Sequence, residues 1–430
     1  MVHDIHTSTW LSTVPQHWKT LRIKNLFDEI DERSETGEEE LLSVSHYTGV
    51  TKKRDSLENE DDFISNAKTL VGYKKVAVND LVSNIMLAWN GSLGISKYEG
   101  ITSPAYCVYR INGENNPHYY GYLFSTAIMK AEFRKKSFGI IDSRLRLYSD
   151  KFFSIPVAVP PKDEQDQIVN YIKAKSKKIK HFIQKKQAFI ELLNEQRQAV
   201  INHKLIIEDR KVKIKYCVTK IGAGVTPTGG ATVYKNSGVI FLRSQNIHND
   251  GLRLDDVAFI TEDIHNSMNG SQVKKDDVLI NITGASIGRT YVFELDEEAN
   301  VNQHVCILRP IKDKILPKFL MLQLQSDMIQ NQIKTIEGAS REGLTNSTLK
   351  NYYIYTPSIE RQMELITEVK TETIKIDQAI AKAEKEIELI KEYREAMIAE
   401  AVLGKLHHKI MGNRSEIPNS SEEPMPQLTN

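Results

Sequence analysis

The segment ELLNEQRQAVI, residues 191–201, returns with few changes as ELIKEYREAMI at residues 388–398. Its Glu, Leu, Glu, Arg, Ala and Ile recur at a constant separation of 197 residues. The same separation relates several upstream residues without a gap: Pro160 to Pro357, Gln165 to Gln362, Ile179 to Ile376 and Ile183 to Ile380. Two Lys/Glu-rich helices share some identities by chance, but they would hardly keep a flanking proline in the same register. The sequence therefore predicts an internal duplication.

Both copies are predicted to form long helices. No Gly or Pro occurs between residues 162 and 221 or between 358 and 403, and both stretches are rich in good helix formers. Apolar side chains recur every three or four residues, which gives each helix an apolar stripe that needs a partner. The residues predicted to pair the helices are Ile172, Ile179, Ile183, Ile190 and Leu193 in the first stretch, and Val369, Ile376, Ile380, Ile387 and Ile390 in the second.

Each predicted helix follows a unit that is rich in strand-forming segments, such as SPAYCVYRI in the first unit and HVCILRP in the second. We expect short helices at 117–136 and 317–334. The predicted fold class is α+β, with two similar β-rich domains separated by two long helices. The predicted boundaries are 1–160 and 209–356 for the globular domains, 161–208 and 357–408 for the helices, and 409–430 for a disordered tail.

Composition narrows the class of protein. Hydrophobic residues make up 40% and charged residues 26% of the 430 residues, which is typical of a soluble globular protein, and the net charge is only +1. No apolar run approaches the ~20 residues that span a bilayer, and the first residues do not resemble a signal peptide, so we expect a cytoplasmic protein without membrane association. Three distant cysteines argue for a reducing compartment and against a disulfide frame or a metal site.

Residues 284–288, GASIG, match the G-x-S-x-G motif of serine hydrolases, with Ser286 as the candidate nucleophile. That motif requires a strand-to-helix turn, whereas the following RTYVF predicts a second strand. The repeat offers another explanation: GSLG at 91–94 aligns with GASIG's last four residues, 285–288, after a small shift in register. We therefore interpret the segment as a small-residue turn between strands and expect no catalytic residue there.

The duplication and its motifs resemble the specificity (S) subunit of type I restriction–modification systems. The entry to the first helix, PPKDEQ at 160–165, is similar to the family's Pro-Pro-x-x-Glu-Gln. The second copy, PSIERQ at 357–362, lacks the second proline and has Arg361 in place of the glutamate. In the second domain GVIFLRSQNI, GASIGRTYVF and EGASREGLTNSTLKNYYI fit the family's recognition-domain pattern, while residues of about 30–75 match only vaguely.

The resemblance implies that each globular domain reads one half of a bipartite, gapped double-stranded DNA target. It also implies that the helices form an antiparallel coiled coil, set the gap and hold two DNA adenine methyltransferase subunits, which restriction (motor/nuclease) subunits join. The S subunit would be non-catalytic. S-adenosylmethionine, ATP and Mg would then belong to the partner subunits. In agreement, the chain has no phosphate-binding loop, no methyltransferase Asn-Pro-Pro-Tyr and no zinc motif.

Candidate DNA-reading residues are polar or cationic side chains near the turns, because such groups contact base edges and phosphates. In the first domain they are Lys52, Lys53, Arg54, Asn84, Trp89, Asn90, Ser143, Arg144 and Arg146. In the second they are Arg243, Ser244, Gln245, Asn246, Thr283, Ser286, Arg289, Ser340 and Arg341. Two other functions stay open on the sequence: a coiled-coil scaffold carrying two protein-binding modules, and a serine hydrolase.

Overall fold

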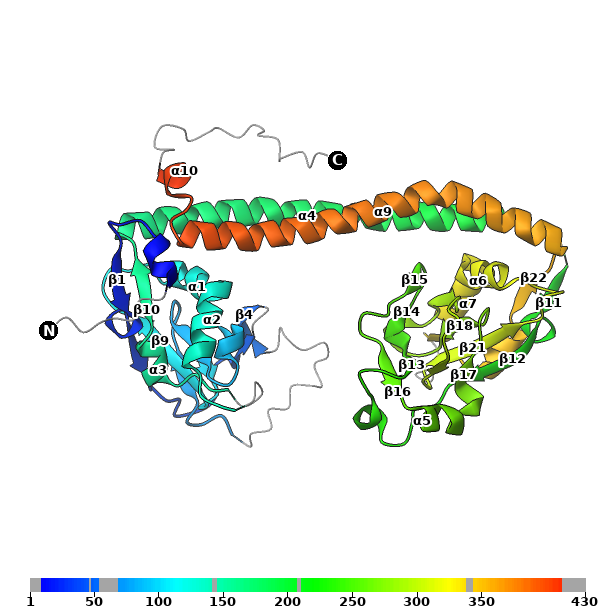
Figure 1. The fold of residues 1–430 in the computed structure, drawn as a ribbon, viewed down its shortest axis with the longest axis horizontal. Helices are drawn as coiled ribbons and strands as arrows, with labels where there is room; N and C mark the ends of the chain where they lie inside the picture. Colours follow the sequence, from blue (N-terminus) through cyan, green and yellow to red (C-terminus); the bar gives the residue numbers. More distant parts are fainter. Residues whose placement is uncertain are drawn as a thin grey trace. The chain divides into compact units, whose positions relative to one another are not determined.

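The computed structural model describes residues 9–45, 48–53, 69–140, 145–206, 210–337 and 343–411. The chain divides into two compact units. Unit 1 comprises Met1–Lys185 and Glu386–Asn430, and unit 2 comprises Lys186–Lys385. Each unit contains one globular domain together with one part of each of the two long helices, α4 (Lys162–Lys204) and α9 (Ile359–Val402) (Figure 1). The two units are described separately below.

The domain of unit 1 is built on a four-stranded antiparallel sheet of order β2-β9-β6-β7. Its strands are β2 (Phe27–Ile30), β9 (Tyr106–Ile111), β6 (Leu81–Asn84) and β7 (Leu93–Ile95). Three further strand pairs are β1 (Lys19–Arg22) with β10 (Pro156–Val159), β3 (Leu42–Ser45) with β4 (Gly49–Lys52), and β5 (Lys74–Val76) with β8 (Gly100–Thr102). The helices are α1 (Pro117–Ser125), α2 (Ala127–Lys136) and α3 (Ser149–Phe153).

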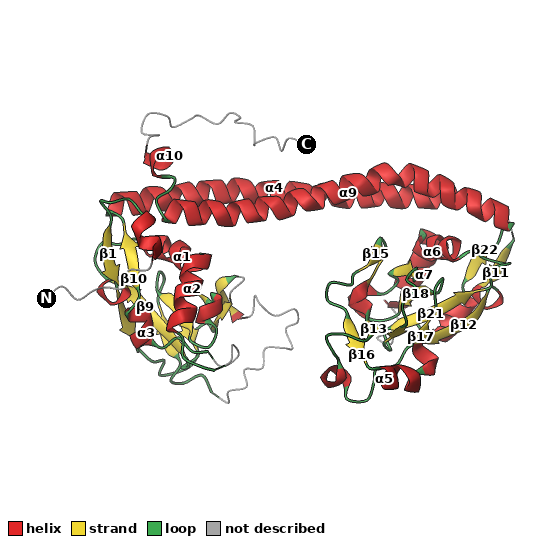
Figure 2. Cartoon of the chain, in the orientation of Figure 1, coloured by secondary structure: helices red, strands yellow, loops and turns green. Residues whose placement is uncertain are grey.

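The domain of unit 2 repeats this plan with the sheet β12-β21-β18-β19 (Figure 2). These strands are β12 (Val218–Ala223), β21 (Val305–Pro310), β18 (Val278–Asn281) and β19 (Thr290–Val292). A second four-stranded sheet contains β16 (Ala258–Ile260), β13 (Val239–Leu242), β20 (Ala299–Val301) and β17 (Gln272–Val273); the remaining pairs are β11 (Lys211–Lys213) with β22 (Tyr353–Tyr355), and β14 (Ile247–His248) with β15 (Gly251–Leu252). The helices are α5 (Glu262–Ser267), α6 (Pro317–Gln325), α7 (Asp327–Glu337) and α8 (Asn346–Asn351).

Backbone details confirm the predicted duplication. Asn79 and Asp276, 197 residues apart, are the non-glycine residues with positive φ in the described chain, at 73° and 74°. Both helices α1 and α6 begin at a proline, Pro117 and Pro317, where a missing N–H costs nothing. The same local conformations therefore recur in both copies, as expected if one domain was copied to make the other.

A buried ion pair occurs at the same place in both sheets. In unit 1 the guanidinium of Arg110 donates two hydrogen bonds of 2.9 Å to Asp80, whose side chain is 2% exposed. In unit 2 Arg309 donates two of 2.7 Å to Asp277. The hydrogen bonds to each carboxylate raise the pKa of its arginine, which keeps the guanidinium charged. A bidentate pair of this kind fixes the register between β9 or β21 and the turn that precedes β6 or β18.

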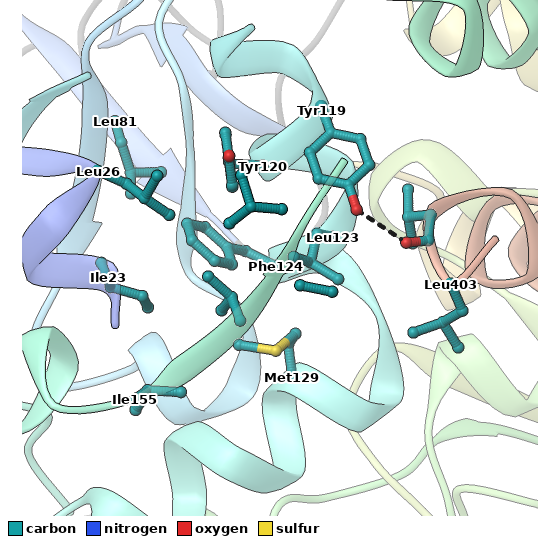
Figure 3. Packing of buried hydrophobic residues seen from close by; sticks show 14 of the residues in the cluster. Ile23, Leu26, Leu81, Tyr119, Tyr120, Leu123, Phe124, Met129, Ile155 and Leu403 are labelled. Atoms are coloured by element: carbon teal, nitrogen blue, oxygen red, sulfur yellow. Dashed lines mark hydrogen bonds between the residues drawn. The ribbon is translucent and has the colours of Figure 1, made fainter. Parts of the chain in front are cut away.

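The core of unit 1 joins the domain to the helices. Its cluster includes Tyr119, Tyr120 and Phe124 of α1, together with Met397 and Leu403 near the end of α9. Figure 3 shows Tyr119 pointing toward this end of α9, where its hydroxyl donates a 3.0 Å hydrogen bond to the carbonyl of Val402. The C-terminal end of α9 is thus part of the first domain's core, although more than 280 residues separate the two segments.

Within each unit the two long helices run antiparallel. In unit 1 Ile172 and Ile179 of α4 share a core with Ile398 and Ala401 of α9, so the start of α4 lies beside the end of α9. In unit 2 the relation is reversed, because Ile201 of α4 packs with Leu365 and Val369 of α9. Ion pairs flank this second contact: Arg197–Asp377 at 2.8 Å, and Lys204 with Glu368 at 3.1 Å and Glu372 at 2.7 Å.

The predicted pairing residues divide into two levels of burial. Fully buried are Ile172, Ile179, Val369, Ile376 and Ile387, whereas Ile183, Ile190, Leu193, Ile380 and Ile390 are half-buried. A pair of helices covers only a narrow seam on each partner, so residues beside the seam keep contact with solvent.

The helix ends also differ from the predicted boundaries of 161–208 and 357–408. Helix α9 ends at Val402, Gly404 follows with a φ of 73°, and α10 (His407–Met411) takes in the first residues of the predicted tail. In the described part of the chain, no helix is both long and apolar enough to cross a membrane.

A buried glutamine fastens each long helix to its domain. The amide nitrogen of Gln165 donates to the carbonyl of Pro160 at 2.9 Å, and its oxygen accepts from the backbone N–H of Asn116, which caps α1, at 2.8 Å. Gln362 repeats both contacts, donating to Pro357 at 2.9 Å and accepting from the N–H of Leu316 before α6 at 2.8 Å. These contacts give a physical reason for the proline and glutamine that the sequence repeats.

We predict that Gln165→Leu destabilises unit 1 by about 2–3 kcal/mol, because it leaves a buried N–H and a buried C=O without partners. Thermal or urea unfolding followed by circular dichroism measures this loss. The control is Gln184→Leu on the same helix, where the side chain is exposed and the expected change is within about 0.5 kcal/mol. An equal loss of unfolding free energy in the two variants would show that the hydrogen bonds of Gln165 do not stabilise unit 1.

We also predict that the cysteines of the folded chain are unreactive near pH 8. Burial raises the pKa of Cys306 to about 12 and also raises the pKa of Cys107 and Cys217 above the ordinary value of about 8.5. Only the thiolate attacks a disulfide reagent, so labelling by Ellman's reagent should be slow until urea unfolds the chain. Because the folded state keeps protons that the unfolded state loses, stability should fall as pH rises above about 8.5. Fast labelling of all three thiols in the native protein would contradict this prediction.

Candidate nucleic-acid interface

The turn after β18 gathers several candidate residues of the second domain. Asn281, at the end of β18, is fully buried, and its amide nitrogen donates to the carbonyl of Ser244 at 2.8 Å and to Oγ of Ser286 at 3.0 Å. One buried amide therefore ties the segment after β13 to the turn 284–286. The sequence analysis placed Ser244 and Ser286 in separate motifs, and the structure brings them together.

The structure aligns the two turns without the shift in register that the sequence analysis used. The N–H of Asn281 donates to the carbonyl of Arg289 at 2.8 Å, and the N–H of Asn84 donates to that of Ser92 at 3.0 Å. Gly91 and Gly288 then fall on the same place, with φ values of 92° and 83° that favour glycine. The sequence-based alignment of residues 91–94 (GSLG) with 285–288 (ASIG) was wrong. It matched the Ser-x-Gly that both segments contain, whereas the register is fixed by the glycine in the left-handed conformation, Gly91 or Gly288.

This alignment also answers the question of Ser286. The turn joins β18 to β19, which pair antiparallel, so the predicted strand–turn–strand arrangement is confirmed and the strand-to-helix elbow is not formed. The hydroxyl of Ser286 accepts a 3.0 Å hydrogen bond from the amide nitrogen of Asn281. The first copy has Trp89 at this position, 197 residues earlier, so the serine is not a shared feature of the two turns.

Two predicted reading residues are committed to the interior. Asn84 is 5% exposed; its oxygen accepts from the N–H of Met86 at 3.1 Å, and its nitrogen lies 3.3 Å from the Tyr106 hydroxyl. Asn246 is 2% exposed, accepting from the N–H of Arg243 and donating to the carbonyl of Arg253. Both amides therefore hold turns of their own domain together, and a contact of either with a base stays a prediction.

The remaining candidates of the second domain lie at the surface beside this turn. The guanidinium of Arg243 lies 5.8 Å from the centre of the Tyr234 ring and donates to the carbonyl of Asp256 at 2.8 Å. Gln245 is exposed and donates to the carboxylate of Asp256 at 2.9 Å. Asp256 thus holds both side chains, and DNA contact by either would require them to exchange this partner.

Thr283 and a returning loop form the other side of the turn. Oγ1 of Thr283 lies 2.6 Å from Nδ1 of His304. Leu344 donates its N–H to the carbonyl of Ile282 at 2.8 Å, so the chain resumes next to Thr283 after residues 338–342. Ser340 and Arg341 lie outside the described residues.

The first domain has an aromatic and cationic version of this turn. Trp89 is half-buried, and the Arg134 guanidinium of α2 lies 5.2 Å from the centre of its ring. The aliphatic end of the Lys130 side chain lies against Gly91, and Asn90 is exposed. The candidates named from the sequence did not include Arg134 or Lys130, because only the fold brings α2 to the turn. The available sequence signal was their spacing of four residues, which places both on one face of a predicted helix that adjoins the turn.

The other candidates of the first domain are partly engaged or not described. Lys52 forms an ion pair with Glu40 at 3.2 Å and lies 5.5 Å from the centre of the Tyr98 ring, and Lys53 follows it directly. Arg146 is half-buried and pairs as an isolated bridge with Phe138. The described residues do not include Arg54, Ser143 or Arg144.

A groove of about 760 Å³ adjoins the second turn within unit 2. Its lining includes Arg289 from the turn and, from the adjoining elements, Arg197, Arg253, Lys318 and Lys370. Arg197, Arg253 and Lys318 form ion pairs with acidic neighbours. Among the described residues, the guanidinium of Arg289 has no hydrogen-bond or ion-pair partner, which leaves it available to an anionic ligand.

One group of potential metal ligands occurs in the described residues. His17, Glu164 and His407 place one ligand atom each within 4.8 Å of the others. They belong to unit 1 and lie 147 and 243 residues apart in the sequence. No local spacing motif could have revealed them, and the sequence analysis expected no metal site.

The chain is similar to proteins of a known family. Two segments, residues 15–192 and 217–388, match the sequence profile described as the type I restriction modification DNA specificity domain. The specificity subunit of the EcoBI type I restriction enzyme from Escherichia coli is 26% identical over 170 residues. That match covers 39% of this chain and 36% of the relative, about a third of the relative's length.

Two solved structures resemble this chain at low sequence identity, and the first of them shares its fold. A chain from a study of assembly and conformational transition of the type I R-M system has 15% identity and a TM-score of 0.58, with 90% of this chain and 98% of that chain covered. The HsdS subunit from Thermoanaerobacter tengcongensis has 16% identity and a TM-score of 0.42, with 91% and 98% covered. Because the two profile matches together span most of the sequence, the chain belongs to the type I restriction–modification DNA specificity family.

Proposed function

We propose that this chain is the DNA-recognition subunit of a type I restriction–modification complex and that each globular domain reads one half of a bipartite, gapped duplex target. The observation that carries the proposal is the repeated turn, which places Trp89, Asn90 and Arg134 at the surface of one domain and Arg289 beside a groove lined by both cationic and acidic residues in the other. Cations supply phosphate contacts, and arginine, asparagine and glutamine read base edges. Two copies of one reader suit a two-part target.

The long helices would set the gap between the two half-sites. Helix α4 continues for 43 residues without glycine or proline, which corresponds to roughly 64 Å at 1.5 Å per residue. One turn of B-DNA is about 34–36 Å long, so a spacer of this length suits half-sites between one and two turns apart. Each domain is fastened to the helices by its own glutamine bridge, which would keep the spacing from varying.

The outer faces of the helices support a role in assembly. Several large apolar side chains on α4 and α9 are more than 40% exposed: Phe189, Leu192, Met363, Ile374 and Tyr393. Exposed apolar groups along a helix pair are typical of a surface that a partner covers. We propose that two adenine methyltransferase subunits bind there and that restriction subunits join them. S-adenosylmethionine, ATP and Mg would act on those partners, and this chain would be non-catalytic.

The proposal predicts the methylation pattern of the assembled enzyme. Co-expression of this chain with an adenine methyltransferase subunit should give a co-purifying complex, and mapping of methylated adenines should yield one motif of two short half-sites with an unspecified gap. A complex that methylates a continuous motif would contradict the gap-setting role. A chain that binds other proteins but has no affinity for double-stranded DNA would support the alternative, a coiled-coil scaffold with two protein-binding modules.

At single-residue level, we predict that Arg289→Ala weakens binding of the cognate duplex by about 1–3 kcal/mol if the guanidinium contacts a base. If it contacts a phosphate instead, all duplexes should be affected alike and the salt slope should fall by about 1. Fluorescence anisotropy of the complex at several salt concentrations separates these outcomes. Lys312→Ala is the charge-matched control, because Lys312 is 70% exposed and paired with Asp276. Affinity and salt slope that match the control would exclude Arg289 from the interface.

A further inference from the structure

Three segments of unit 1 meet at one group of side chains. His17 precedes β1, Glu164 lies in the first turn of α4, and His407 begins α10. Nε2 of His17 is 2.8 Å from Oε1 of Glu164, and Nδ1 of His407 is 3.5 Å from Oε2 of the same carboxylate. The two imidazole rings are 5.3 Å apart. The three ligand atoms all lie within 4.8 Å of one another.

We propose that this group binds one divalent transition-metal ion, with zinc as the fitting example. Two imidazole nitrogens and one carboxylate oxygen are a ligand set that zinc accepts, with a water molecule in the fourth position. Metal–ligand distances of 2.0–2.2 Å place neighbouring ligand atoms of a tetrahedron roughly 3.4 Å apart. Nε2 of His17 lies 2.8 Å from Oε1 of Glu164, and the three ligand atoms all lie within 4.8 Å of one another, so side-chain adjustments bring them to that spacing.

The surroundings of the cluster support a ligand rather than a plain ion pair. Among the described residues, Nδ1 of His407 is buried from solvent and has no hydrogen-bond partner. A buried ring nitrogen without a partner is costly, and a metal ion at this place would satisfy it. The indole N–H of Trp18 donates to Oε2 of Glu164 at 2.9 Å. Such a second contact orients a ligating carboxylate, because it holds one oxygen while the other binds the metal.

The internal repeat shows that the fold does not require this cluster. The residue 197 positions after Glu164 is Arg361, which pairs with Glu364 at 2.8 Å and Glu368 at 3.0 Å. The residue 197 positions before His407 is Arg210. The second copy therefore closes the start of its long helix with an arginine–carboxylate network. Packing alone does not explain two histidines around a carboxylate in the first copy.

A bound ion would link both ends of the chain to the start of α4. The segments are already adjacent, because Gly404, at the end of α9, packs against Pro15 and Trp18. The metal would add a cross-link between residues 17 and 407, and the stability of unit 1 would then depend on the metal concentration. This role goes beyond DNA recognition and needs no partner subunit.

The test uses the full chain, freed of metal with a chelator and titrated with zinc chloride in competition with a chromophoric chelator. We expect one zinc per chain and a rise in melting temperature on zinc addition. Cobalt(II) should give the visible absorption bands of a tetrahedral site. Both effects should be lost in His17→Ala and in His407→Ala.

The matched control is His408→Ala, which removes the exposed neighbouring imidazole and should leave zinc binding unchanged. Glu164→Gln is a second variant, since an amide oxygen still accepts from Trp18 but is a poor zinc ligand; it should stay folded and bind zinc more weakly. Circular dichroism verifies folding of every variant. Absence of zinc uptake by the wild type, retention of uptake in both folded alanine variants, or an equal loss in His408→Ala would overturn the proposal. None of these measurements involves DNA, so the outcome is independent of the proposed recognition function.

Discussion

The attachment of each domain to its helix depends on one buried side-chain amide. Gln165 and Gln362 each bridge a proline carbonyl at the helix entry and the N–H that precedes a domain helix. A glutamine suits this place because it offers a donor and an acceptor without a charge that burial would penalise. A glutamate could not donate to the carbonyl, and a leucine would leave both backbone groups unpaired. The amide therefore fixes the direction in which the long helix leaves the domain.

The duplication repeats such interior contacts and changes what surrounds them. The bridging glutamine and the Asp–Arg pairs Asp80–Arg110 and Asp277–Arg309 keep their geometry in both units. The glutamines and the two carboxylates are buried, and a buried polar group that loses its partner costs more than most surface changes. Other positions at the helix entry are less constrained, since Glu164 in the first copy is replaced by Arg361 in the second.

Sequence reasoning could predict the elements whose signal is periodic or repeated. The constant separation of 197 residues and the apolar stripe identify both long helices, and the prolines and glutamines that flank them prove to be structural. Side chains whose role depends on tertiary neighbours were harder to assign. Asn84 and Asn246 look like surface amides in the sequence, but they fasten turns in the interior, where their partners are backbone groups that no sequence pattern displays.

Contacts between distant segments were invisible for a related reason. Arg134 reaches Trp89 because α2 packs on the turn, and His407 reaches Glu164 because α9 returns to the first domain. The spacing of Lys130 and Arg134 on a predicted helix hints at the first contact, whereas the second leaves no local spacing in the sequence. The register of the two turns was also misjudged, since matching letters outweighed the conformational requirement of Gly91 and Gly288, which only the backbone reveals.

The corrected register bears on the kind of DNA target that such a chain can read. With Gly91 and Gly288 superimposed, Trp89 corresponds to Ser286, Asn90 to Ile287 and Ser92 to Arg289. The neighbouring helix differs as well, because Lys130 lies against the first glycine and Gln330 against the second. The first turn presents the large ring of Trp89 near cationic side chains, and the second presents the small hydroxyl of Ser286 beside Arg289. These two surfaces differ in shape and in the hydrogen-bonding groups that they offer to a base edge. Under the proposed function, two domains that share a scaffold but differ at every one of these positions would suit unlike half-sites, and the two parts of the target would not be inverted copies of one another.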